Sequence, residues 1–168
     1  GYAVEAKSPK RTAILRDMHA TVIVRPGATV FVSNMCGHLY QEPGSTVWIR
    51  QWNTEGGPAK LQVNTRNTGG LLWVLGMKTE GFSTKVQTLD DGRTEVLGVH
   101  NYNTSGARDD TPFFHVRDAV LSVGAYREVC FVHRWWRVPA LAEFGDQAFR
   151  HPPKEWQNWG LLRAGNTE

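Results

Sequence analysis

The chain has 168 residues and a formal net charge of +3, so it is long enough to bury a core without a metal or a disulfide. Its 19 basic and 16 acidic residues are scattered, which argues against nucleic acid as a partner, and the HRWWR cluster at residues 133–137 is better explained as a packed edge with exposed arginine heads. No stretch approaches the roughly 18 apolar residues of a membrane span, so a membrane is not an expected partner either.

The first 17 residues contain neither an initiator methionine nor an apolar signal core. We therefore expect a mature, tagged or truncated product. An upstream domain of the same protein is a candidate partner.

Copies of one short β-prone motif then follow each other along the chain. They read PGATVFVSN from Pro26, PGSTVWIRQ from Pro43, GGLLWVLGM from Gly69, DGRTEVLGV from Asp91 and, more weakly, RDAVLSVGA from Arg117. A second β-prone run precedes each copy, with a corner of Pro, Gly, Asn or Asp between the two runs. One equivalent position is occupied by Phe31, Trp48, Trp73, Glu95 and approximately Leu121.

Like residues at like positions are typical of a solenoid, in which each strand lies on its own equivalent. We therefore predict an all-β fold, a right-handed parallel β-helix of about five or six coils over residues 1–138. An antiparallel sandwich of hairpins is the alternative. Alternation within the second strand of each unit predicts an inward ladder of Val30, Val47, Leu72, Thr94, Val32, Ile49, Val74 and Val96.

Residues 139–168 differ in character, and we predict an irregular, partly helical tail that caps or covers the same domain. A short helix is expected to begin at Pro139 and to include Phe144, with proline in its first turn. Cys36 and Cys130 should lie several coils apart, too far for a disulfide, and are interpreted as small apolar fillers.

Four segments in this order resemble the pectate-lyase-like superfamily of right-handed β-helix proteins, and more narrowly the closing coils of bacterial members related to the β-helical glucanases. They read PGSTVWIRQWNTEG, GGLLWVLGMKTEG, GRTEVLGVHNYNTSG and PFFHVRDAVLSVGAYRE, and the resemblance extends over roughly residues 38–128. The resemblance implies the fold and the recognition or cleavage of polysaccharide by an extracellular protein. It transfers no catalytic residue, because the calcium-binding aspartates and the arginine base of pectate lyases have no assured place here.

An outward row of Phe31, Trp48 and Trp73, one coil apart, would suit the stacking of successive sugar rings. Hydroxyl groups would be bonded along the same flank by Arg50, Gln51, Glu55 and Glu80. The alternative is that a neighbouring loop or the tail, with Trp156 and Trp159, covers the row as a second small core.

Glu55 and Glu80 are equivalent by repeat and are weak candidates for catalysis, since retaining glycosidases hold two carboxyls about 5 to 5.5 Å apart. Any stacked pair of glutamates would show a similar spacing. Such a pair could equally be solvated and salt-bridged to Arg50 or Lys78.

No cofactor is expected, although a structural calcium ion is left open. Its weak candidate ligands are the turn and loop carboxylates of Asp90, Asp91, Asp109 and Asp110. The six histidines show no spacing that is typical of zinc or copper sites.

The sequence thus favours a secreted or cell-surface module that binds a polysaccharide or oligosaccharide. The first alternative is a glycoside hydrolase or polysaccharide lyase that acts on plant or microbial glycans. The second is a purely structural β-helix cap.

Overall fold

The computed structural model describes residues 2–55, 63–81, 83–104, 111–131, 138, 140–150 and 158–165. Over these residues the chain is all-β, and 13 strands form one curled, mostly parallel sheet. The strands are β1 (Ala3–Ala6), β2 (Thr12–Val24), β3 (Thr29–Gln41), β4 (Thr46–Thr54), β5 (Val63–Thr68), β6 (Leu71–Glu80), β7 (Thr84–Leu89), β8 (Arg93–Asn103), β9 (Phe114–Arg117), β10 (Val120–Cys130), β11 (Ala140–Phe144), β12 (Gln147–Arg150) and β13 (Asn158–Gly165).

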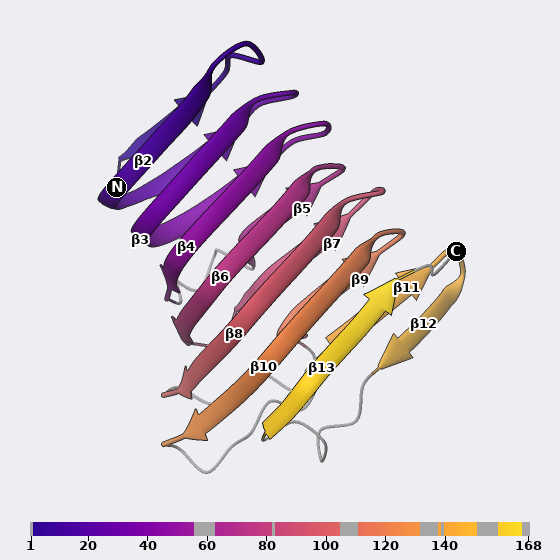
Figure 1. The fold of residues 1–168 in the computed structure, drawn as a ribbon. Helices are drawn as coiled ribbons and strands as arrows, with labels where there is room; N and C mark the ends of the chain where they lie inside the picture. The colour runs from indigo at the N-terminus through magenta and orange to yellow at the C-terminus, as the bar shows by residue number, and fades with distance from the viewer. Residues whose placement is uncertain are drawn as a thin grey trace.

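The sheet curls because β3 has a different neighbour along each half. Its residues 29–36 pair with β4, and its residues 39–41 pair with β5. One arm continues as β4-β6-β8-β10-β13 and the other as β5-β7-β9-β11-β12. Residues 12–19 of β2 and 29–36 of β3 belong with the first arm, which we call the front layer, and β1, residues 20–24 of β2 and residues 39–41 of β3 belong with the second, the back layer. In Figure 1 the long front strands lie side by side with the shorter back strands behind them.

Glycine allows β3 to pass from one layer to the other. Gly37 has φ 136°, and a Cβ atom there would lie 2.0 Å from the backbone oxygen of Ala20 on β2. No side chain fits in that space, so the close approach of β2 and β3 requires glycine at this position.

Equivalent positions of the repeat lie in register on parallel neighbours. Phe31 pairs with Trp48, Trp48 with Trp73, and Trp73 with Glu95. The predicted stacking of like on like is confirmed, and these strands do not form a sandwich of antiparallel hairpins. The fifth copy is shifted by one residue, because Ser122 rather than Leu121 pairs with Glu95.

The predicted inward ladder forms the core. Its members are at most 3% exposed, and Leu121 continues the row of Leu72 and Thr94. Burying a Val, Leu or Ile side chain contributes about 1.5–3 kcal/mol, so this ladder is a main source of stability. Buried side chains of the back layer complete the core, among them Leu39, Val86 and Val116.

Buried amides hold the corners between the back and front strands. Gln41 Nε2 donates to the backbone oxygen of Leu71 at 2.9 Å, and Asn67 Nδ2 donates to that of Gly70 at 3.0 Å. Gln41 and Asn67 pair in register. Polar side chains occupy these buried positions because they satisfy carbonyl groups of the corners.

The C-terminal part of the chain is not helical where it is described, so the predicted helix near Phe144 is wrong. Residues 140–144 form β11, which pairs in parallel with β9. Ala140 and Ala142 are buried, so period-two alternation and strand pairing prevail over the local helix signal. β12 and β13 then add antiparallel strands to β11 and β10.

The described part of the chain contains no helix with the length and apolarity of a membrane span. Cys36 is a free cysteine. Three strands, β4, β6 and β8, lie between the strand of Cys36 and that of Cys130.

Candidate functional site

One residue in each of six front strands has left-handed backbone, and these residues line up across the sheet. On either side of Gln51, for example, Arg50 pairs with Leu75 and Trp52 pairs with Met77, which leaves Gln51 beside Gly76. We call the set the left-handed row. Its φ values are 50° at Asp17, 53° at Asn34, 60° at Gln51, 83° at Gly76, 83° at Gly98 and 54° at Ala125.

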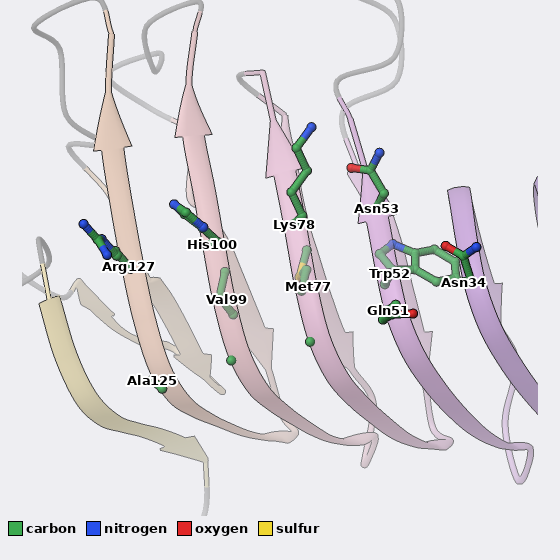
Figure 2. A pocket seen from close by; sticks show the side chains of 12 residues that line it. Asn34, Gln51, Trp52, Asn53, Met77, Lys78, Val99, His100, Ala125 and Arg127 are labelled. Carbon is green, nitrogen blue, oxygen red and sulfur yellow. The ribbon is translucent and has the colours of Figure 1, made fainter.

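The left-handed row interrupts the alternation of side chains. Ile49 and Trp52 both point into the core, so Arg50 and Gln51 are two successive exposed positions. Five members of the row, those from Asn34 on β3 to Ala125 on β10, line a groove of about 480 Å³ that crosses the strands. Figure 2 shows its lining, of which the polar members are Asn34, Gln51, Asn53, Lys78, His100 and Arg127.

The wall of this groove repeats from strand to strand. Asn53, Lys78, His100 and Arg127 are successive partners in the parallel ladder of β4, β6, β8 and β10. Neighbouring members are thus about 4.8 Å apart in the backbone. The groove therefore offers one amide, ammonium, imidazole or guanidinium group per strand.

Lys78 links the two glutamates that the repeat brings together. Its Nζ lies 2.9 Å from Glu55 Oε1 and 2.5 Å from Glu80 Oε1. Hydrogen bonds from Lys78 and then Asn53 lower the pKa of Glu55. Burial lowers the pKa of Lys78, but hydrogen bonds to the two glutamates outweigh burial and raise that pKa.

These pKa shifts bear on catalysis. The general acid of a glycosidase needs a raised pKa, so that it holds a proton at neutral pH. Glu55 has the opposite shift, and Lys78 neutralises charge between the two carboxylates. The lowered pKa therefore argues against Glu55 as the general acid of a glycosidase.

A buried polar side chain anchors the backbone of each glutamate. Asn64 Nδ2 donates to the backbone oxygen of Glu55 at 2.6 Å, and Lys85 Nζ donates to that of Glu80. Lys85 Nζ also donates to Ser83 Oγ at 3.1 Å. The Lys85 side chain is fully buried, and burial lowers its pKa to about 7.

The rings of Phe31, Trp48 and Trp73 form a stack, which we call the aromatic strip. The ring centroids of Phe31 and Trp48 are 4.6 Å apart at 10°, and those of Trp48 and Trp73 are 5.4 Å apart at 6°. Both faces of Trp48 are thus covered by neighbouring rings, and the strip presents ring edges to solvent. Direct stacking of a sugar on Trp48 is incompatible with this arrangement, whereas a contact with ring edges is not.

The tail strand β13 does not lie beside the aromatic strip. Its partner is β10, with Trp159 opposite Tyr126, and β8 and β10 separate it from β6. Phe31 is 44% exposed. Trp156 lies outside the described residues, as does the HRWWR cluster.

The structure brings only part of the predicted polar flank into the groove. Gln51 lines it, and Glu55 and Glu80 contact its wall through Lys78. Arg50 instead donates to Ser33 Oγ at 3.4 Å. Gln51 was predicted as a site residue and Lys78 as an ion-pair partner. The other four polar lining residues were not predicted from the sequence, where their only signal is the broken alternation beside them: Asn34, Asn53, His100 and Arg127.

Of the four candidate calcium ligands, Asp90 and Asp91 lie within the described residues, and both are in a turn. Asp90 and Asp91 have φ 52° and 62°, and Asp90 Oδ1 accepts a hydrogen bond from Arg117 at 3.4 Å. Asp109 and Asp110 lie outside the described residues. Within the residues that the structure describes, no group of three His, Cys, Asp or Glu side chains could hold a metal ion.

No protein-family model matches the chain, and comparisons with curated proteins and with solved structures found no significant match. The resemblance to the pectate-lyase-like superfamily therefore has no support from these comparisons. The interpretation of the groove depends on its own geometry.

Proposed function

We propose that the chain is a secreted or cell-surface module that binds polysaccharide, with the right-handed parallel β-helix fold of the pectate-lyase-like superfamily. The observation that supports this most is the groove, whose polar wall recurs in register once per strand. A polymer of similar units can repeat its contacts along such a wall, whereas a compact ligand would use only one or two positions.

The chemistry of the lining suits sugar hydroxyls. Amides donate and accept, and the guanidinium of Arg127 donates in a fixed plane. In this proposal Gln51 and Arg127 bond hydroxyl groups in the groove, with Glu55 and Glu80 holding Lys78 in place. Arg50 and the edges of Trp48 and Trp73 contact the sugar along the adjoining rim.

Gln51 offers a direct test, because glycine suits its backbone conformation. Gln51→Gly removes the side chain and keeps the left-handed backbone, while Ala125→Gly is the matched control in the same row. We expect affinity electrophoresis on soluble neutral and uronate glycans to show retardation of the native protein. The retardation should fall in Gln51→Gly and persist in Ala125→Gly.

Two results would count against binding in the groove. One is a native protein that none of the glycans retards, and the other is a Gln51→Gly variant that is retarded as strongly as the native protein. Trp48→Ala and Trp73→Ala test the rim separately, and weaker retardation is expected for both.

Cleavage of the glycan is the second candidate, since Glu55 and Glu80 follow the paired residues Thr54 and Thr79 on adjacent strands. A hydrolase would release reducing ends, and a lyase would form an unsaturated product that absorbs in the ultraviolet. Either activity should disappear in Glu55→Gln or Glu80→Gln. A structural cap would show neither retardation nor product.

A further inference from the structure

Half of β2 has a free edge in the front layer. β3 pairs with β2 from Thr12 to Val24, whereas β1 pairs only with residues 21–24. Among the described strands, none pairs with residues 12–19 on the side away from β3. Backbone N–H and C=O groups along such an edge are available to another strand.

The interior beneath this edge is incompletely covered. Ala13, Leu15 and Met18 pack against the core but are only partly buried. Their partners in β3 are Val30, Val32 and Met35. Those partners are 0%, 3% and 1% exposed, because β4 lies on them.

The two ends of the sheet differ in their direction of pairing. At the far end β12 and β13 are antiparallel to their neighbours. At this end β1 is parallel to β2 and in register with it, from Ala3 opposite Thr21 to Ala6 opposite Val24. Pairing on this edge of β2 is thus already parallel where it exists.

We propose that residues 12–19 of β2 form a docking edge for one more parallel strand, supplied by a β-coil of the same repeat type. Its inward side chains would cover Ala13, Leu15 and Met18. It would also need a residue with left-handed backbone beside Asp17, because each of the six strands in the left-handed row has such a residue at the aligned position. This inference is independent of the proposed polysaccharide binding.

A second copy of the chain fits this edge less well. Two copies related by a two-fold axis pair the same edge antiparallel. If the two-fold axis passes through Ile14, the antiparallel pairing extends only over residues 12–16, because the left-handed residue Asp17 then breaks the alternation. A parallel strand with its own left-handed residue can follow the whole edge.

The test uses the full chain and a synthetic peptide with the sequence of residues 46–54, which contains the required pattern. Amide hydrogen exchange is followed by NMR, with a paramagnetic label at the peptide N-terminus. We expect slower exchange for those amides of residues 12–19 that face the free edge. The label should broaden signals near Thr12, as parallel pairing requires, rather than near His19.

Leu15→Lys places a charge at an inward edge position that is partly exposed, and it should abolish the protection. Leu71→Lys is the control, since Leu71 is 39% exposed on β6, away from this edge. Ala13→Asp provides a second disruption if Leu15→Lys does not fold.

Three results would overturn the proposal. The first is unchanged exchange over residues 12–19 at saturating peptide, and the second is broadening near His19. The third is protection of the same amides without peptide, together with a dimer in sedimentation, which would identify a second copy as the occupant.

Discussion

Lys85 is a fully buried amine whose hydrogen-bond partners are neutral. They are the backbone oxygen of Glu80, Ser83 Oγ at 3.1 Å and Asn64 Oδ1 at 3.4 Å. Burial lowers the pKa of this amine to about 7, so its charge opposes folding. The same side chain nevertheless anchors the backbone next to the groove wall.

We predict that Lys85 makes stability depend on pH between about 7 and about 10.4, the usual lysine pKa. In this window the unfolded chain binds one more proton than the folded chain, so the free energy of unfolding rises as the pH rises. Urea unfolding at several pH values measures this slope. The difference in stability between native protein and Lys85→Met should change by a few kcal/mol across the window, and parallel curves would contradict the prediction.

The left-handed row predicts opposite effects for two small substitutions. Ala125→Gly should stabilise by about 1 kcal/mol, because an L-residue in left-handed backbone is strained. Gly98→Ala should destabilise by about 1 kcal/mol for the same reason alone, since no atom lies within 4 Å of the added Cβ. Denaturant unfolding of both variants measures the two changes in the free energy of unfolding. Changes of the same sign would exclude backbone strain as the explanation.

At the scale of the strands, alternation allowed much of the front layer to be predicted. The pattern around Val47 and Ile49, repeated at Leu72 and Val74, gave both the inward face and the register that β4 and β6 adopt. The helix near Phe144 was a wrong prediction, because pairing with β9 is a long-range interaction that a local signal does not contain.

The candidate site was harder to predict from alternation. Gln51 was predicted, but a strict alternation beyond it assigns the wrong face to the following residues. The left-handed residue shifts the pattern, so Trp52 is buried and Asn53 lines the groove. The stacking of Phe31 on Trp48 also depends on side-chain rotation, which the spacing of residues does not specify.

The passage of β3 between the layers depends on Gly37, and we predict a large effect for Gly37→Ala. The added Cβ would lie 2.0 Å from a backbone oxygen, so β2 and β3 must separate locally. The loss of stability should exceed about 3 kcal/mol, well above that of Gly98→Ala, where only backbone strain acts. Chemical denaturation of the two variants side by side makes the comparison, and similar losses would refute it.

For the whole molecule, we predict a gradient of local stability along the sheet. β4, β6 and β8 each have a strand on both sides, whereas residues 12–19 and β12 have one partner among the strands that the structure describes. Opening a strand with one partner breaks fewer contacts, so its amides should exchange sooner. Native-state hydrogen exchange should show the slowest amides in the middle strands, and uniform exchange across the sheet would contradict this view.

The aromatic strip also gives the molecule an optical signature. The indoles of Trp48 and Trp73 are nearly parallel and 5.4 Å apart, close enough for their electronic transitions to couple. Circular dichroism should therefore contain an exciton component that disappears when either indole is replaced. Such a signal would report the alignment of β4 on β6 continuously, without any added probe.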